Sequence, residues 1–197
     1  FGSSPFGLSS TRPAALHALC AATATIMADE PSPKKAKTEK PAYTWNLNKF
    51  LDKDLETCSL HELVDKPVTA LQGLAALGTQ ALSHRKVMTV SDLAHWKFYK
   101  IARGLLVCES AEEAGKRDAA SEMNINKAVV KQWETKTVAE ILDAPVSALQ
   151  GLTSADDEHF AKVHVKTIRD LGSWKYARWA EAICDLAEFE STEHASK

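Results

Sequence analysis

The sequence lacks the features that would place it in several functional classes. Its formal net charge is −2, so bulk charge points neither to nucleic acid nor to an anionic membrane as partner. No apolar run approaches the roughly 18 residues that a membrane-spanning helix needs. No Ser/His/Asp, Cys/His or glycine-rich nucleotide signature is present. We therefore predict a protein that is not an enzyme, with no catalytic residue, no cofactor and no small-molecule substrate.

The cysteine and histidine residues that could bind a metal are scattered along the sequence. The four cysteines are Cys20, Cys58, Cys108 and Cys184. None belongs to a CxxC pair, whereas a structural zinc site needs clustered soft ligands. His159 and His164 are five residues apart, a spacing that puts two side chains on different faces of a helix. We expect no metal site, and reduced, mostly packed thiols in an intracellular protein.

The first 43 residues differ in composition from the rest of the chain. Residues 1–26 are rich in Ser, Ala and Thr, and Met27 begins a different style of sequence. Two interpretations of 1–26 stay open. The segment is a translated spliced leader upstream of Met27, which Phe1–Ser4 resembles, or it is the remnant of a targeting peptide. Residues 27–43 offer little to bury, so we expect all of 1–43 to be a disordered tail.

Lysines gather within this tail. The segment Pro31–Lys40 includes Ser32-Pro-Lys-Lys35. Such a motif can serve nuclear import or contact the phosphates of a DNA minor groove, and it can also be an ordinary solvated tail. It points to the nucleus, with the cytoplasm or an organelle as alternatives. Its possible contact residues are Lys34, Lys35 and Lys37.

The remainder of the chain repeats itself at an offset of 78 residues. Pro67–Leu74 matches Pro145–Leu152, and Val87–Leu93 matches Val165–Leu171. We count about 22 identities over some 62 ungapped positions, which indicates a duplicated module. The predicted domains are a first repeat at 44–110, a second repeat at 122–191, a segment 111–121 that is a linker or an extension of the preceding helix, and a disordered tail at 192–197.

Each repeat is predicted to be a bundle of five short helices without a sheet, so the fold class is all-α. Asn46–Glu56 and Asn124–Glu134 are the predicted first helices. Pro67 and Pro145 should end the second helix of each repeat. The last helix should be the longest, over Trp96–Cys108 and Trp174–Phe189. Capping-box spacing, a hydroxyl followed three residues later by an acid, marks helix starts at Ser59 and Glu62, Thr137 and Glu140, Thr89 and Asp92, and Thr167 and Asp170.

Three tryptophans have two possible roles. Trp96 and Trp174 occupy the same position of the two repeats, which favours shared core packing over a role as interface anchors. Trp179 replaces Ile101 and is left open between these roles.

The segment Leu149–Leu171 resembles a helix-hairpin-helix module. Such modules have an apolar residue, a glycine turn, a helix and an ending of the form T-[IV]-x-D-L, which Thr167–Leu171 matches. The first repeat follows the same plan from Leu71 to Leu93. Of the two glycines usual in the turn, only the first is kept, as Gly73 and Gly151. Two residues later stand Ala75 and Thr153.

The resemblance implies binding to duplex DNA without sequence preference, through turn amides that face a phosphate. The second repeat departs from that use, because Asp156, Asp157 and Glu158 open its helix and repel phosphate. At the same place the first repeat has the neutral residues Gly78, Thr79 and Gln80. Related folds also serve protein contacts, so the fold does not decide the ligand.

We therefore predict a non-catalytic tandem helical module that binds a macromolecule, with a protein as the expected partner. The alternative is a DNA- or chromatin-associated protein that uses the hairpin turns and the lysine tail. Basic residues around the first turn and last helix are candidate contacts, although they also fit an ordinary charged surface. Gln150 could cap a local amide or face a partner. The candidates in the repeats are Gly73, Gly78, Arg85, Lys86, Lys97, Lys100, Arg103, Gln150 and Gly151.

Overall fold

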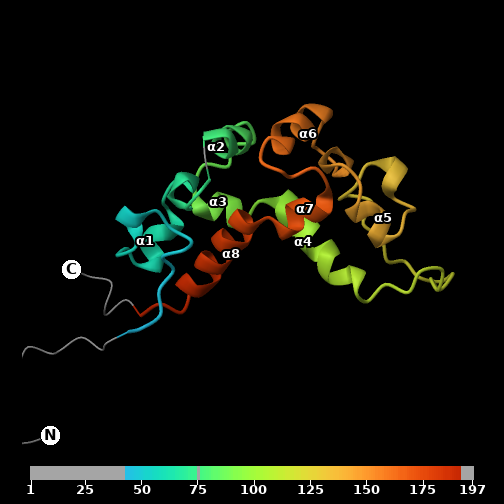
Figure 1. The fold of residues 1–197 in the computed structure, drawn as a ribbon. Helices are drawn as coiled ribbons and strands as arrows, with labels where there is room; N and C mark the ends of the chain where they lie inside the picture. Colours follow the sequence, from blue (N-terminus) through green and yellow to red (C-terminus); the bar gives the residue numbers. More distant parts are fainter. Residues whose placement is uncertain (1–42, 75, 192–197) are drawn as a thin grey trace, which may run out of the picture. The chain divides into compact units, whose positions relative to one another are not determined.

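A computed structural model describes residues 43–74 and 76–191 of the chain. The chain divides before Thr44, and the unit that begins there contains every described helix (Figure 1). No β-strand occurs among the described residues, in agreement with the predicted all-α class. We call residues 44–110 the first half and residues 122–191 the second half.

The same series of elements runs through both halves, each mixing α-helices with short 3-10 helices. The first half contains the elements η1 (Lys53–Leu55), α1 (Leu60–Val64), η2 (Val68–Ala70), α2 (Ala76–Ser83), α3 (Val90–Ala94) and α4 (Lys97–Glu109). The second half contains η3 (Lys131–Trp133), α5 (Val138–Leu142), η4 (Val146–Ala148), α6 (Ser154–Ala161), α7 (Ile168–Ser173) and α8 (Lys175–Ala187). Every element of the second half begins 78 residues after its counterpart, the offset found in the sequence.

Local capping determines where the short helices begin. All four predicted capping boxes are present, at the starts of α1, α3, α5 and α7. In each box the hydroxyl accepts a backbone N–H and the acid accepts the N–H of the cap residue, so two otherwise unpaired donors are satisfied. Pro67 and Pro145 follow α1 and α5 and open η2 and η4, as predicted.

The predicted first helix of each half is wrong. Asn46–Glu56 contains only the 3-10 turn η1, and Asn124–Glu134 contains only η3. The backbone of the first segment pairs with the η2 region instead: Asp52 N–H donates to Ala70 O at 3.0 Å, and Gln72 N–H donates to Phe50 O at 2.8 Å. Donors used in this way cannot enter a helix. Among the described residues each half thus has four α-helices and two 3-10 turns, in place of five helices.

The segment 111–121 does not extend the preceding helix. The helix α4 ends at Glu109, and only turns and irregular backbone follow up to Ser121. The final helix of the second half ends at Ala187, two residues before the predicted end at Phe189.

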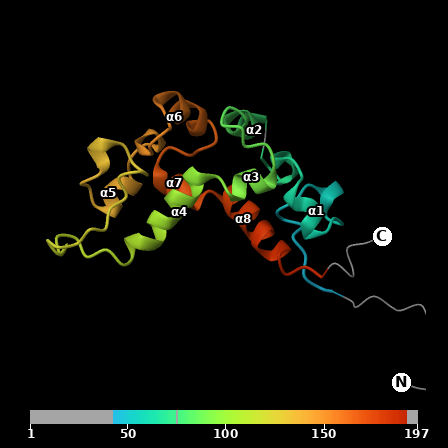
Figure 2. The ribbon, with the colours of Figure 1, turned by 180° about the vertical axis from the view of Figure 1, so that it is seen from behind.

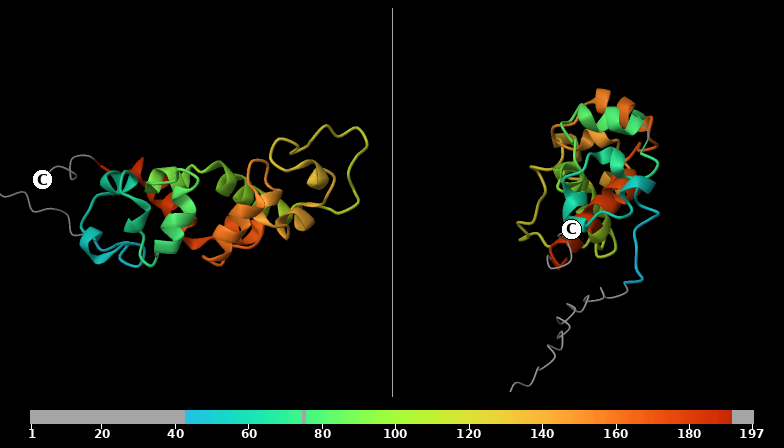
Figure 3. Two further views of the ribbon diagram at one scale, coloured as in Figure 1. Left: turned by 90° about the horizontal axis from the view of Figure 1, so that it is seen from above. Right: turned by 90° about the vertical axis from the view of Figure 1, so that its left-hand side faces the viewer.

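The two halves exchange their last helices. The helix α4 of the first half packs mainly against α7 and α5, while α8 of the second half packs mainly against α3 and α1. Figures 1 and 2 show the red α8 beside the blue-green α1 and the green α3, with the yellow-green α4 beside α5 and α7. The view from above in Figure 3 also places α8 among the helices of the first half. Each half therefore completes its core with a helix from the other.

The junction before each last helix explains the exchange. Only Trp96 separates the C-cap of α3 from α4, and Trp174 alone joins α7 to α8. Both tryptophans have extended backbone angles, with φ −63° and ψ 117° for Trp96 and φ −62° and ψ 117° for Trp174. A one-residue extended junction is too short to turn a helix back onto the preceding elements of its own half.

The two junction tryptophans have matching environments. Each is 7% exposed. Trp96 meets the edge of Phe98 at 5.4 Å between ring centroids, and Trp174 meets the edge of Tyr176 at 5.5 Å. Phe160 lies within ring-contact distance of both tryptophans, so their packing joins the halves. Trp179 is half-buried and stacks on Phe50 of the other half, with centroids 4.7 Å apart.

A carboxylate beyond each exchanged helix caps the first α-helix of the opposite half. Glu190 accepts the backbone N–H groups of Leu60 at 2.9 Å and His61 at 3.0 Å, at the start of α1. Its counterpart Glu112 accepts the N–H of Val138, at the start of α5, at 2.8 Å. Helix N-termini favour such anions because their first amides lack partners inside the helix.

Replacing Glu190 with Gln should lower the free energy of unfolding by about 1 kcal/mol at neutral pH, because the charged cap is lost. Burial works to raise the pKa of the Glu190 carboxyl, but the amides of His61 and Leu60 and the His61 ring outweigh it and lower that pKa. A carboxyl with a lowered pKa stabilises the fold above its unfolded pKa, and that contribution disappears as the pH falls through the folded value. Urea unfolding of wild type and E190Q should therefore converge below about pH 4. The exposed neighbour Glu188, changed to Gln, is the control, and an equal loss in E188Q would contradict the capping role.

Candidate functional site

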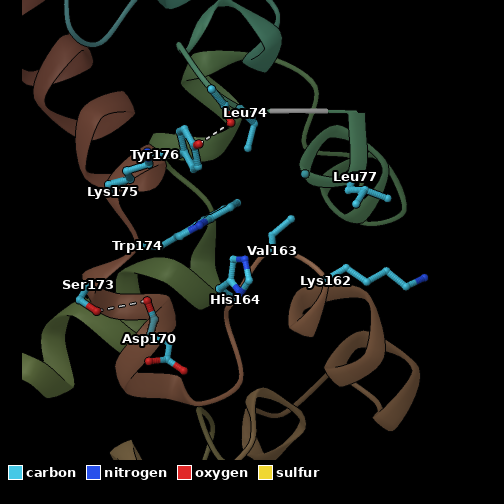
Figure 4. Close-up of a pocket in the computed structure, with 12 residues that line it drawn as sticks. Leu74, Leu77, Lys162, Val163, His164, Asp170, Ser173, Trp174, Lys175 and Tyr176 are labelled. Atoms are coloured by element: carbon cyan, nitrogen blue, oxygen red, sulfur yellow. Dashed lines mark hydrogen bonds between the residues drawn. The ribbon is translucent and has the colours of Figure 1, made fainter.

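A groove in the described residues lies between α2 of the first half and the segment from α6 to α8 of the second half. Its volume is about 510 Å³. Figure 4 shows Trp174 at its centre, with Leu77 on one side and Tyr176 on the other. Its lining residues are Gly73, Leu74, Leu77, Gly78, Lys162, Val163, His164, Asp170, Ser173, Trp174, Lys175 and Tyr176.

The groove combines an apolar interior with basic residues at its ends. Leu77 is 52% exposed, a large apolar side chain open to a ligand. Figure 4 places Lys162 and Lys175 on opposite sides of Trp174. Lys175 also holds its ammonium 4.6 Å from the centre of the Tyr176 ring. Such a surface suits an apolar side chain with negative charge nearby.

The one lining carboxylate belongs to the fold. Asp170 accepts the backbone N–H groups of Lys166 and Thr167, both at 3.0 Å, in the capping box of α7. Burial opposes ionisation, but these bonds outweigh it and lower the pKa of Asp170. Its charge is therefore already used by backbone donors at the rim of the groove.

An ion pair occupies the equivalent positions in the contact between α6 and the end of α2. Arg85 takes the position of Val163, and Asp156 takes the position of Gly78. The Arg85 guanidinium forms two hydrogen bonds with the Asp156 carboxylate and donates to the carbonyl of Gly151 at 3.2 Å. On the open side no such pair exists, and Val163 Cγ1 lies 3.6 Å from where a Cβ on Gly78 would stand. Gly78 and Val163, which line the groove, are thus smaller and uncharged at the positions where Asp156 and Arg85 form an ion pair.

The two turn glycines have the backbone conformation that glycine permits. Gly73 has φ +85° and Gly151 has φ +109°. Each turn also contacts the opposite half. The Tyr176 hydroxyl donates to the carbonyl of Gly73, and the Phe98 ring lies 3.4 Å from where a Cβ on Gly151 would be. The turns at Gly73 and Gly151 thus belong to the contact between the halves.

The arginines among the candidate contacts are both engaged within the fold. Arg85 is bound to Asp156, and the Nε of Arg103 lies 2.5 Å from an oxygen of Glu181. Lys86, Lys97 and Lys100 are exposed, and the Lys97 ammonium lies 4.6 Å from the centre of the Phe98 ring. Gln150 is also exposed. Sequence reasoning grouped these residues as one surface, and the structure separates the paired arginines from the exposed lysines.

Several predicted features lie outside the described residues. These are the tails 1–42 and 192–197, the lysines Lys34, Lys35 and Lys37 with the rest of Pro31–Lys40, Cys20 and the turn residue Ala75.

The described cysteines are dispersed and unpaired with one another. Cys184 is buried, Cys58 is partly buried and Cys108 is exposed. Burial, with a smaller contribution from Asp185 and Asp65, raises the pKa of Cys184 to about 11, so this thiol stays protonated. Among residues 43–74 and 76–191, no group of three His, Cys, Asp or Glu side chains could hold a metal ion. No helix in the same residues is long and apolar enough to cross a membrane.

The candidate contacts Gly73 and Gly78 line the groove, but other residues that shape it were not predicted. Val163 and Leu77 are ordinary apolar residues whose importance depends on what the opposite half presents. Asp156 was considered only as a charge that repels phosphate, whereas it is 1% exposed and bound to Arg85. At the 78-residue offset Arg85 aligns with Val163 and Gly78 with Asp156, but residues 75–86 and 153–164 share no identity, so the sequence does not single these positions out.

Comparison of the chain with protein-family models, with curated proteins and with solved structures finds no match.

Proposed function

We propose that this chain is a non-catalytic tandem helical module that binds another protein. Its groove holds a peptide segment with an apolar side chain flanked by carboxylates. The observation that carries this proposal is the asymmetry of the groove. Leu77, Val163 and Trp174 line an open volume of about 510 Å³, while Arg85 and Asp156, at the positions equivalent to Val163 and Gly78, form an ion pair.

The proposal includes gene duplication as the origin of the two halves. The common 78-residue offset of all elements and the matching contacts of Trp96 and Trp174 support it. The helix-hairpin-helix resemblance of Leu71–Leu93 and Leu149–Leu171 rests on their motifs. After duplication, one copy of the groove stayed open and the other closed. We therefore expect one bound segment per chain.

A protein ligand is favoured over DNA by the state of the basic residues. Arg85 and Arg103, which could have contacted phosphate, are bound to carboxylates. Both hairpin turns contact the opposite half, so their surfaces are partly covered. Non-specific DNA binding depends on several cationic groups that can each neutralise a phosphate. DNA binding through the exposed lysines and the lysine tail is the second candidate.

Panning a phage-displayed peptide library on the full chain tests the groove. Enriched peptides should share an apolar residue within a few positions of Asp or Glu and should bind with one peptide per chain by calorimetry. L77E and V163R should weaken the best peptide by at least about tenfold, because each fills or charges a surface that buries an apolar side chain. V163R introduces the residue that the opposite side carries.

Met88 supplies the matched control. It is 53% exposed, as Leu77 is 52% exposed, but it does not line the groove. M88E should keep wild-type affinity. Enrichment of basic peptides, equal weakening by M88E and L77E, or two peptides per chain would each contradict the proposal. Binding of the full chain to a random DNA duplex that is unaffected by L77E and lost at high salt would favour the second candidate instead.

A further inference from the structure

The halves meet through unlike residues at equivalent positions. Arg103 on α4 and Glu181 on α8 are 78 residues apart, so they occupy the same position of the repeat. They contact each other, with Arg103 Nε 2.5 Å from Glu181 Oε2. Contact between equivalent positions is what a twofold arrangement of two copies produces at its axis. In this protein the two residues that meet at the axis, Arg103 and Glu181, have opposite charges and are not identical.

Four residues before Arg103 and Glu181, the two last helices also carry side chains of different size, Tyr99 on α4 and Ala177 on α8. Tyr99 is fully buried, and its hydroxyl donates to Glu181 Oε2 at 2.8 Å. Its counterpart on α8 is Ala177, also fully buried. Two first halves would bring two Arg103 side chains and two Tyr99 rings to the axis. Two second halves would bring two Glu181 carboxylates together beside two small Ala177 side chains, which leave space unfilled.

A second contact, away from the axis, also favours the pairing of a first half with a second half. Arg85 of the first half binds Asp156 of the second, and the equivalent contact joins Gly78 with Val163. A pair of second halves would place Asp156 against Val163. The carboxylate, 1% exposed in the observed arrangement, would then lack its guanidinium. Removing one partner of a buried ion pair is strongly destabilising, so this contact disfavours a pairing of like halves.

We propose that the surface between the halves is selective for the pairing of a first half with a second half, with Arg103 and Glu181 as its specificity-determining pair. The partner that fits this surface from outside is the complementary half of a second copy of the chain. A dimer formed in this way exchanges second halves across the linker 111–121. In the wild type, the linker gives the halves of one chain a high effective concentration, which keeps the pairing within the chain at micromolar concentrations.

Two full-length variants test this pairing. In R103E both positions are acidic, and in E181R both are basic, so each variant has like charges within its own chain. When the two are mixed, the first half of the R103E chain can pair with the second half of the E181R chain through opposite charges, and the other two halves restore the wild-type pair. Native mass spectrometry of one isotope-labelled and one unlabelled variant should show a mixed dimer about tenfold above either self-dimer. That excess should shrink severalfold in about 1 M salt, which screens charge.

The double variant R103E/E181R distinguishes a lost charge pair from a general failure of the single variants to fold. It reverses the pair within one chain, and the Tyr99 hydroxyl can accept from the new guanidinium on α8 as well as it donates to Glu181 in the wild type. The double variant should be a monomer that regains most of the thermal stability lost by either single variant. The mixture of R103E with R178E is the control, because Arg178 is an exposed neighbour on α8 and the change offers no new pair. Equal mixed and self dimers, a double variant no more stable than the singles, or a mixed excess with R178E would overturn the proposal.

Discussion

Replacing Arg85 with Val should lower the free energy of unfolding by about 3 kcal/mol at neutral pH, the low end of the cost of breaking a buried ion pair. Asp156, the only charged side chain among the described residues that is fully buried, would lose its guanidinium partner. The Thr153 N–H and hydroxyl would still donate to it, at 2.7 and 2.8 Å, which is why the low end is expected. Urea unfolding followed by circular dichroism measures the change.

The pH dependence of R85V should separate lost charge from lost packing. In the wild type burial acts to raise the pKa of Asp156, but the bonds from Arg85 and Thr153 outweigh it and lower that pKa. The wild type therefore loses this contribution as the pH falls through the folded pKa. Without Arg85 one of the influences that lower the pKa of Asp156 is gone, so that pKa should rise above its wild-type value and R85V gains stability relative to the wild type on acidification. The gap between the two free energies of unfolding should therefore narrow as the pH falls toward the carboxyl range near about 4 and below.

The double variant R85V/D156G gives the matching control. It gives positions 85 and 156 the residues found at their equivalent positions, which are Val163 and Gly78. Replacing both partners of a buried pair with apolar groups is often close to neutral. Asp156 also forms the capping box of α6 with Thr153, and its loss should cost about 1 kcal/mol. R85V/D156G should therefore be more stable than R85V alone. If the double variant is the less stable of the two, the two residues do not act as a pair.

The sequence alone predicts the local structure better than the assembly. The capping boxes at Ser59, Thr89, Thr137 and Thr167 depend on residues three apart, so their outcome is decided locally. The failed first helices show the limit of that reasoning. Residues 50–52 pair with the backbone near η2, a contact across some 20 residues that no local pattern reports.

The exchange of α4 and α8 could not be predicted from periodicity. An apolar stripe on a helix shows that one face is buried, but not which surface covers it. Trp96 and Trp174 looked like core residues of separate bundles, and both are buried at junctions that send the next helix to the opposite half. The unlike pairs Arg103–Glu181 and Arg85–Asp156 were visible as differences between the repeats. These differences predict a contact between the halves only once the structure shows that the differing residues touch each other.

Replacing Gly172 with Ala should lower the free energy of unfolding by about 2 kcal/mol, as expected for an added methyl group in a packed contact. Gly172 is buried on α7, where α4 crosses it. A Cβ on Gly172 would stand 2.7 Å from the carbonyl oxygen of Ala102 and 2.8 Å from its carbonyl carbon. These atoms belong to the backbone of α4, so the two helices would have to move apart.

The opposite result is expected for Gly104, which lies on the exposed face of the same α4. A Cβ there would meet nothing within 4 Å. G104A should therefore raise the free energy of unfolding by about 0.5–1 kcal/mol, because alanine is the better helix former. The counterpart of Gly172 is Ala94, so the packing of α3 against α8 already accepts the methyl group that α7 against α4 excludes. Gly172 contacts Ala102 only when α4 packs on the second half. If G172A and G104A have the same free energy of unfolding, that contact is absent, and the exchange of the last helices is contradicted.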